Sequence, residues 1–206
     1  MIYLIGGAPK VGKSTVAKCL RERTAYLSIS TDAVRALVFE ITHPSMRADL
    51  LPCCVPVTRI GDQFKQSIDD WVKSQLREAQ TLTPSIVALI YYHLRIGEDL
   101  ILEGVHLVPD LVEEILKSDY SSDLKTILVL ADDEVTVLNA LHSKTGGFNW
   151  LAGLSEETVK KVAECIVAYS LLVERQAQTL GIKTFQRTDD FNCDVKQIVS
   201  LLTKEG

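Results

Sequence analysis

The chain has 206 residues, which is enough for one well-buried α/β domain and short for two domains of ordinary size. Hydrophobic residues make up 47% and charged residues 24%, a balance that excludes a disordered chain. Its 22 lysine and arginine residues are outnumbered by 27 aspartate and glutamate residues, so the net charge of -5 creates no overall field that attracts nucleic acid. We therefore expect a single domain over residues 1–206 without a nucleic-acid partner, in which a local cluster holds any anionic ligand.

The cysteines and the apolar runs narrow the class further. The five cysteines are odd in number and include no C-x-x-C pair, so we expect neither a disulfide framework nor a zinc site. No apolar run approaches the roughly 18 to 20 residues that cross a membrane, and no basic segment precedes the first short apolar run. These features predict a cytoplasmic protein without a membrane partner, and they leave its oligomeric state open.

Residues 6–15, which are GGAPKVGKST, match the pattern G-x-x-x-x-G-K-[ST] at every fixed position from Gly7 onward. The apolar residues 2–5 before them predict a buried strand, and residues 14–23 after them predict a helix. A chance glycine-rich turn would not have both of these neighbours. The motif in this context predicts a site for a nucleoside triphosphate.

In such a loop, backbone N–H groups and the positive end of the following helix hold a phosphate. Lys13 would reach the outer phosphates, and the Ser14 hydroxyl would bind Mg²⁺. A nucleoside triphosphate, either ATP or GTP, and Mg²⁺ are therefore the expected cofactors. The expected nucleotide-binding residues are Gly7, Ala8, Pro9, Lys10, Val11, Gly12, Lys13, Ser14 and Thr15.

A second short strand is expected at residues 26–29, and Asp32 follows its carboxyl end, where ligands bind in open α/β sheets. Asp32 is our candidate to accept a hydrogen bond from an acceptor hydroxyl, and Arg35 our candidate to hold an anionic group of the acceptor. The alternative is that Thr31 or Asp32 only caps the next helix, at 33–40. That helix is expected to turn its apolar residues inward, namely Val34, Leu37, Val38 and Ile41.

Residues 42–60 are predicted to be irregular and to cover the site, because prolines interrupt any long helix there, at Pro44, Pro52 and Pro56. Arg47 and Arg59 lie in this segment and are further candidates for binding the acceptor. The simpler interpretation of either one alone is a solvated surface arginine.

Two helices are predicted next, at 61–80 and 84–95, from apolar residues at helical spacing. Trp71 in the first of them is expected in the core. With the segment before them they form a helical insertion, about residues 42–97, which we expect to bind the substrate.

The apolar residues 100–102 predict a third, buried strand, and Glu103 follows it directly. An acid in that place in a P-loop protein is expected near Mg²⁺. The alternative is a chance surface glutamate. His106 lies between apolar neighbours and is either a structural hydrogen-bonding residue or a contact of the acceptor.

The remainder of the chain predicts two more strands and four more helices. The strands fall at 126–130 and 182–185, and the helices at 109–117, from Asp132 or Asp133 to about His142, at 156–180 and at 194–202. Residues 143–154, which are rich in glycine around Phe148 and Trp150, predict a mobile connection in the place of a lid.

Three stretches together resemble the kinase domain of 2-phosphoglycerate kinase: the phosphate loop, residues 29–35 (ISTDAVR) and residues 101–109 (ILEGVHLVP). In the last of these, acid, glycine, histidine and proline occur in the family's order. The resemblance implies an α/β P-loop NTPase fold with a five-stranded parallel sheet in the order 2-3-1-4-5, flanked by helices, with a helical insertion and a lid. It also implies transfer of the γ-phosphoryl group of ATP to the 3-hydroxyl of 2-phosphoglycerate.

The chain departs from the family on the helix that enters the lid. Enzymes that resemble it carry a histidine and several arginines there, where this chain has Thr136, Asn139 and His142. Such arginines clamp the transferring phosphoryl group, and losing one can cost several orders of magnitude in rate. Lys144 and His142 are the nearby residues that could replace them, and we include Lys144 among the expected substrate-binding residues.

The expected catalytic residues are Lys13, Asp32 and Glu103, and the expected metal ligands are Ser14, Asp32 and Glu103. The expected substrate-binding residues are Asp32, Arg35, Arg59, His106 and Lys144. The sequence leaves open which of the two acids serves as the base. It also leaves three functions open: an ATP- and Mg²⁺-dependent kinase of a small anionic metabolite, a kinase of another small hydroxyl compound such as a sugar acid or a nucleotide sugar, or a nucleotide-binding regulatory module with little turnover.

Overall fold

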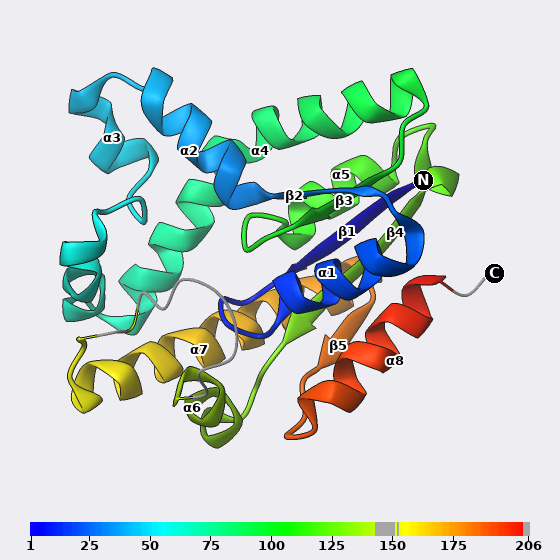
Figure 1. Ribbon diagram of the computed structural model, residues 1–206. Helices are drawn as coiled ribbons and strands as arrows, with labels where there is room; N and C mark the ends of the chain where they lie inside the picture. The colour runs from blue at the N-terminus through cyan, green and yellow to red at the C-terminus, as the bar shows by residue number, and fades with distance from the viewer. Residues whose placement is uncertain (143–150, 152, 204–206) are drawn as a thin grey trace.

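Parallel strands form the centre of the molecule, in a computed structural model that describes residues 1–142, 151 and 153–203. The five strands run in the order β2-β3-β1-β4-β5 (Figure 1). They are β1 (Ile2–Gly7), β2 (Leu27–Ser30), β3 (Leu100–Glu103), β4 (Leu124–Leu130) and β5 (Thr184–Gln186). Strands buried on both faces consist of continuous apolar runs, as β1 and β3 do. The predicted sheet order is confirmed.

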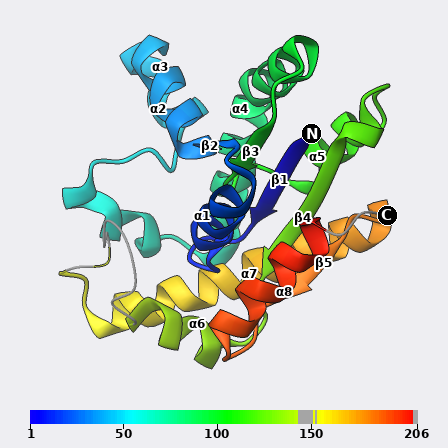
Figure 2. The same ribbon diagram turned by 45° about the vertical axis from the view of Figure 1, so that its right-hand side comes forward.

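Helices cover both faces of this sheet. α1 (Lys13–Thr24) and α8 (Phe191–Thr203) pack on one face, and α4 (Ile68–Ile96), α5 (Pro109–Leu116) and α7 (Glu156–Leu180) lie on the other (Figures 1 and 2). Successive residues of a strand point to opposite faces. Ile2 and Leu4 accordingly pack in one apolar cluster with residues of α4 and α5, whereas Tyr3 and Ile5 pack in another with residues of α1.

α2 (Thr31–Ile41) begins directly after β2, and its first turn is capped by Ser30, whose side chain accepts a hydrogen bond from the backbone N–H of Asp32. The alternative that Thr31 or Asp32 is the cap is therefore wrong. The expected inward face is also wrong in part, because Leu37 and Ile41 are 71% and 85% exposed. Of the four expected residues, Val34 and Val38 pack against the core, because α2 contacts α4 on one side and projects with α3 past the edge of the sheet (Figures 1 and 2).

The segment predicted to be irregular, 42–60, contains regular structure, so that prediction is wrong in part. α3 (Pro44–Leu50) starts at Pro44, since the first turn of a helix tolerates a residue without an N–H. A 3-10 helix, η1 (Val57–Lys65), follows. Residues before α4 that were expected to be α-helical thus adopt the tighter turn.

α4 is a single helix where two were predicted, with Pro84 inside it. Proline removes one hydrogen bond of the helix and crowds the carbonyl four residues earlier. Pro84 is exposed, and the buried residues continue at helical spacing across it, namely Ala79, Leu82, Ile86 and Ile90. Their packing outweighs the local defect. Trp71 in the first turns of α4 is 3% exposed, which confirms its place in the core.

The later elements follow the predictions within three residues at each end: α5, β4, α6 (Glu134–His142), α7, β5 and α8. A short 3-10 turn, η2 (Ser121–Asp123), precedes β4. Asp133 caps α6, because its Oδ2 accepts a hydrogen bond from the backbone N–H of Thr136. The expected lid, 143–154, lies largely outside the described residues. No helix in the described ranges is long and apolar enough to cross a membrane.

Candidate active site

The carboxyl ends of β1, β2 and β3 meet at one edge of the sheet and bring three predicted stretches together (Figure 1). Ile5 of β1 and Ser30 of β2 both pair with Glu103 of β3. The phosphate loop after β1, Asp32 after β2 and Glu103 at the end of β3 are consequently neighbours. This is the edge at which open α/β sheets bind their ligands.

The phosphate loop packs closely against the neighbouring strand. A Cβ on Gly7 would lie 1.9 Å from the carbonyl oxygen of Val129 on β4, and the backbone there has a φ of +118°. Only glycine fits such a position. α1 begins at Lys13, within the same motif, so the positive end of a helix lies at the loop, as anion binding at a helix N-terminus requires.

Lys13 is buried inside this loop, with 6% of the residue exposed, and its Nζ donates a hydrogen bond to the carbonyl oxygen of Ala8. Burial lowers the pKa of Lys13 to about 8, while the carboxylates of Glu103 and Asp32 act in the opposite direction. Both carboxylates therefore lie within electrostatic reach of the ammonium group. An anion beside Lys13 would stabilise its charged form further.

Ser14 and Glu103 join the loop to β3. The Ser14 hydroxyl donates a hydrogen bond to Oε1 of Glu103 over 3.1 Å, and Glu103 is 7% exposed. Hydroxyl and carboxylate oxygens are the ligands that Mg²⁺ prefers, and Mg²⁺ keeps several waters and is held through one or two carboxylates and the substrate phosphates. The described residues contain no group of three or more His, Cys, Asp or Glu that could enclose a metal by themselves. This donor set fits a magnesium ion shared with a nucleotide.

Asp32 and Arg35 form an ion pair next to these groups. Nη2 of Arg35 lies 3.2 Å from Oδ1 of Asp32, whose side chain is 63% exposed, and Nη1 lies 3.4 Å from Oε1 of Glu78. Burial alone would lower the pKa of Arg35, but the carboxylates of Asp32 and Glu78 outweigh it and raise that pKa. Arg35 is thus fully charged and faces the same space as Asp32.

His106 lies deeper, with 1% of the residue exposed. Its Nδ1 is 2.8 Å from Oγ1 of Thr31, and its Nε2 is 3.3 Å from Oε1 of Glu78. His106 therefore contacts the start of α2 and the same carboxylate as Arg35.

Two predicted candidates, Arg59 and Arg47, make their contacts elsewhere in the described part of the chain. Arg59 has a side chain that is 72% exposed and pairs with Asp62 over 3.1 Å. The guanidinium of Arg47 stacks 3.9 Å from the centre of the Phe39 ring. Lys144 lies outside the described residues, and His142, two residues before it, is 3.3 Å from a carboxylate oxygen of Glu156.

Two residues of this site were missed from the sequence. Glu78 is an acid on the inward face of α4, seven residues after Trp71 and four before Leu82, and a charge at a core spacing was the signal that could have revealed it. Arg187 follows β5 directly, at the same edge of the sheet, and a cation in that place was its signal.

Arg187 supports the phosphate loop from the side opposite Glu103. Its Nη1 donates a hydrogen bond to the carbonyl oxygen of Lys10 over 3.2 Å, and its guanidinium stacks 4.7 Å from the centre of the Phe191 ring. Burial lowers the pKa of Arg187, against the charges of Asp194 and Asp189. Its Nε is buried and has no hydrogen-bond partner among the described residues.

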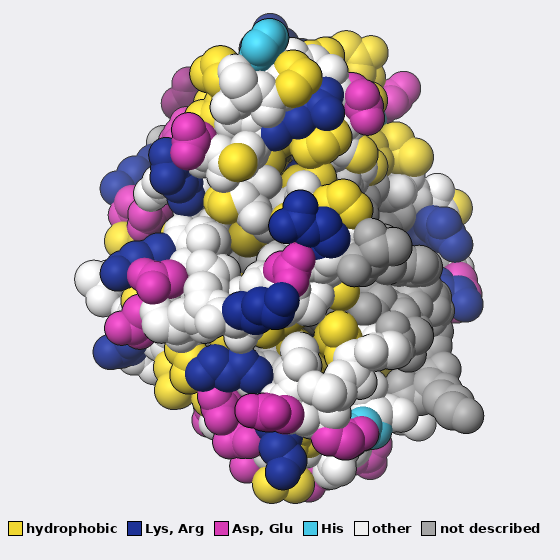
Figure 3. Space-filling view, turned by 90° about the vertical axis from the view of Figure 1, so that its left-hand side faces the viewer, with side chains coloured by type: hydrophobic (Ala, Val, Ile, Leu, Met, Phe, Trp, Pro, Cys, Tyr) yellow, Lys and Arg dark blue, Asp and Glu magenta, His cyan; other side chains and the backbone are white. Residues whose placement is uncertain are grey.

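Among the described residues around this edge, charges of neither sign dominate the surface. Figure 3 views the molecule from the side at which β1, β2 and β3 end, and basic and acidic side chains alternate there among apolar ones. An anionic ligand must therefore be held by individual groups such as Lys13 and Arg35, as the net charge of -5 also requires.

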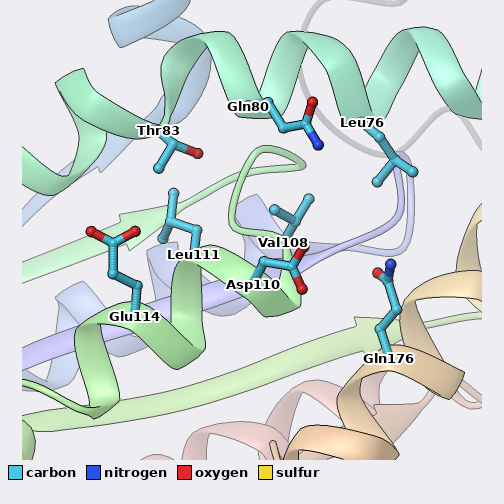
Figure 4. A pocket seen from close by; sticks show the side chains of 8 residues that line it. All are labelled: Leu76, Gln80, Thr83, Val108, Asp110, Leu111, Glu114 and Gln176. Atoms are coloured by element: carbon cyan, nitrogen blue, oxygen red, sulfur yellow. The ribbon is translucent and has the colours of Figure 1, made fainter.

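A pocket of about 220 Å³ lies between α4, α5 and α7 (Figure 4). Its described lining residues are Leu76, Gln80, Thr83, Val108, Asp110, Leu111, Glu114 and Gln176. They include none of the residues of the phosphate loop, nor Asp32, Arg35, Glu103 or His106. This pocket is separate from the candidate active site.

Comparison with known proteins connects this geometry to kinases. No protein-family model matches the chain. The 2-phosphoglycerate kinase of Pyrococcus horikoshii is 33% identical over 117 residues, which cover 55% of this chain and 38% of that enzyme. The mevalonate-3-phosphate 5-kinase of Thermoplasma acidophilum is 27% identical over 120 residues, covering 56% of this chain and 55% of that enzyme. The chain thus spans about two fifths to about half of the length of these curated relatives.

A solved structure matches nearly the whole chain. The shikimate kinase of Bacteroides thetaiotaomicron has a TM-score of 0.55 at 12% identity, with 99% of each chain covered. The predicted resemblance to 2-phosphoglycerate kinases is confirmed over about half of the chain. The predicted fold, a parallel sheet in the order 2-3-1-4-5 flanked by helices, is confirmed in the described residues.

Proposed function

We propose that this protein is an ATP- and Mg²⁺-dependent kinase that transfers a phosphoryl group to a hydroxyl of a small anionic metabolite, in the manner of 2-phosphoglycerate kinase. The observation that supports it most is the hydrogen bond of 3.1 Å between Ser14 and Glu103, formed beside the buried Lys13. It joins the phosphate loop to an acid at the end of a neighbouring strand. A loop that only bound a phosphate, without Mg²⁺, would not require an acid beside its serine.

Phosphoryl transfer requires two anions to be placed in line and the spreading charge to be neutralised. The loop N–H groups and Lys13 would hold the outer phosphates of ATP. Ser14 and Glu103, with Asp32 beside them, would hold Mg²⁺, which supplies charge neutralisation between those phosphates. Asp32 would accept a hydrogen bond from the acceptor hydroxyl, since its exposed carboxylate lies beside Arg35, whereas Glu103 is bonded to Ser14.

Arg35 would hold the anionic group of the acceptor. It is charged, partly exposed and fixed between two carboxylates. The insertion that carries α3, η1 and α4 would form the wall of this acceptor site. Arg59, His106 and Lys144 remain candidates for further contacts with the acceptor.

A second acceptor deserves a place in the test. The two relatives act, by their names, on 2-phosphoglycerate and on mevalonate 3-phosphate. Both compounds carry a phosphate, a carboxylate and a free hydroxyl group. The acceptor class that fits both is a phosphorylated hydroxy acid, and sugar acids form the neighbouring class.

The test is ADP release from ATP and Mg²⁺ in the presence of single acceptors: 2-phosphoglycerate, mevalonate 3-phosphate, a sugar acid, a nucleotide sugar and a neutral polyol. We expect at least one anionic acceptor to stimulate ADP release, and Lys13→Ala to abolish the stimulation. Slow ATP hydrolysis that no acceptor stimulates would identify a regulatory module instead. Stimulation by the neutral polyol alone would contradict the role of Arg35.

A further inference from the structure

Glu78 lies where four segments of the chain meet. It is fully buried on α4. Its Oε1 is 3.4 Å from Nη1 of Arg35 on α2 and 3.3 Å from Nε2 of His106 in the loop after β3. Its Oε2 accepts a hydrogen bond of 2.8 Å from the backbone N–H of Cys53, before η1. One side chain of the insertion thus touches two candidate residues of the acceptor site.

A carboxylate buried in this way is costly unless charges and hydrogen bonds compensate it. The guanidinium of Arg35 and the N–H of Cys53 provide that compensation. Because Arg35 also pairs with Asp32 through its other terminal nitrogen, its guanidinium is fixed at two points. Glu78 therefore fixes the direction in which Arg35 presents its remaining N–H groups.

The contact with His106 also defines where the imidazole carries its hydrogen. An ionised carboxylate only accepts hydrogen bonds, so Nε2 of His106 must donate to Glu78. In a neutral ring Nδ1 is then free to accept the hydrogen of the Thr31 hydroxyl, 2.8 Å away. Glu78 thereby selects the tautomer that orients Thr31, the first residue of α2 and the neighbour of Asp32.

The loop after β3 packs closely against the hydroxyl of Thr31. A Cβ on Gly104 would lie 1.7 Å from Oγ1 of Thr31. Thr31 is accordingly enclosed between Gly104 and His106. The start of α2 has one position while these contacts hold, and Asp32 and Arg35 are placed with it.

We propose that Glu78 is a positioning residue for the acceptor: it fixes Arg35 directly, and it fixes the start of α2 with Asp32 through His106 and Thr31. This inference rests on the proposed function and adds the residue that links the helical insertion to the reacting groups. Glu78 touches neither nucleotide nor acceptor itself. Its loss should therefore affect the acceptor and leave the nucleotide site intact.

The test compares Glu78→Gln, which keeps the shape and removes the charge, with Leu82→Ala, which removes a fully buried apolar side chain one turn further along α4. In Glu78→Gln we expect kcat/KM for the acceptor to fall at least about tenfold, as for loss of a hydrogen bond to a charged group. The Kd for ATP should change by less than about twofold, since the phosphate loop is untouched. Leu82→Ala should lower the thermal midpoint of unfolding. It should not lower kcat/KM for the acceptor selectively relative to the affinity for ATP.

A second readout does not depend on turnover. Nitrogen NMR of the imidazole rings should show His106 of the wild type with its hydrogen on Nε2, and Glu78→Gln should lose that preference. Adding Arg35→Ala should give a double variant whose loss in kcat/KM is smaller than the product of the two single losses, because both act on one guanidinium.

The outcomes separate the two proposals. If no acceptor stimulates the wild type, the proposed function fails, and the His106 spectra alone decide whether Glu78 orients this network. If the hydrogen of wild-type His106 lies on Nδ1, the positioning role is wrong even where the Gln variant does not fold. Two further results would overturn it. One is an equal loss of acceptor kcat/KM in Glu78→Gln and Leu82→Ala. The other is a loss in the Glu78→Gln, Arg35→Ala double variant that equals the product of the two single losses.

Discussion

Lys13 is a buried cation whose Nζ donates a hydrogen bond to the Ala8 carbonyl within its own loop. A phosphate would give it a charged partner, and hydrogen bonds between charged groups contribute about 1.5–3 kcal/mol. Lys13→Ala should therefore lower ATP affinity at least about tenfold, and the thermal midpoint should not fall, because burying an ammonium group is itself costly. Calorimetric titration with ATP and Mg²⁺ measures the first effect.

The matched control is Lys18→Ala, an exposed lysine on the same helix. It should bind ATP like the wild type. Equal affinities for all three proteins would remove Lys13 from the nucleotide site.

Two features require glycine at position 104: the close approach of the Thr31 side chain and the positive φ of +156°. Gly104→Ala would place a Cβ 1.7 Å from Oγ1 of Thr31, so we expect a loss of at least about 3 kcal/mol in the free energy of unfolding, the upper end for overpacking. Gly97→Ala is the control, since its φ is +69° and a Cβ there would meet nothing within 4 Å. It should cost about 1 kcal/mol for the left-handed backbone alone. Chemical denaturation that gives equal losses for both variants would exclude the steric explanation.

The helix α4 offers a direct test at the scale of an element. Pro84 is exposed inside a continuous helix, so Pro84→Ala removes no packing and restores a hydrogen bond. We expect the free energy of unfolding to rise by about 1–3 kcal/mol, the range given by the helix propensity of proline. Urea denaturation measures this free energy. A lower value in Pro84→Ala than in the wild type would indicate that two helices meet at Pro84, as predicted from the sequence.

The loop after β5 should contribute to nucleotide binding through the shape of the phosphate loop. Arg187 donates to the Lys10 carbonyl, and Lys10 has a positive φ of 60°. Arg187→Ala should weaken ATP binding about tenfold, as loss of a hydrogen bond from a charged donor does, with acceptor KM little changed. Arg175→Ala, an exposed arginine on α7, is the control. An unchanged Kd for ATP in Arg187→Ala would show that the phosphate loop does not depend on Arg187 for its shape.

How far the sequence predicts these elements depends on how local their causes are. The strands and α7 follow from apolar periodicity, and the phosphate loop follows from a motif whose glycines have a steric reason. α4 was divided wrongly because the packing of Leu82, Ile86 and Ile90 against the sheet, which outweighs Pro84, is a tertiary effect. Leu37 and Ile41 follow the helical period, yet no described element covers them, and periodicity alone cannot show that.

The same distinction holds for the site. Asp32 and Glu103 could be placed from the sequence, because parallel strands bring their carboxyl ends to one edge. The core spacing of Glu78 could reveal that it is buried but not what it contacts, because its partners Arg35, Cys53 and His106 come from three separate segments. The role of a buried acid at an apolar spacing can be inferred only when the segments that compensate its charge are known.

At the scale of the whole molecule, the proposed nucleotide site and the proposed acceptor site meet along the carboxyl edge of the sheet. Lys13, Ser14 and Glu103 lie on one side, and Asp32 and Arg35 on the other. The helical insertion reaches this edge through Glu78. We propose that this arrangement moves a phosphoryl group from ATP to an acceptor hydroxyl.

Phosphorus NMR of the wild-type protein with ATP, Mg²⁺ and 2-phosphoglycerate, repeated with mevalonate 3-phosphate and a sugar acid, can detect this transfer. With one of these acceptors we predict a new phosphoester signal that grows in step with ADP. Asp32→Asn and Glu103→Gln should slow it at least about a hundredfold, as for groups in base or metal roles. Conversion of ATP to ADP and inorganic phosphate at one rate, with or without every acceptor, would contradict the account.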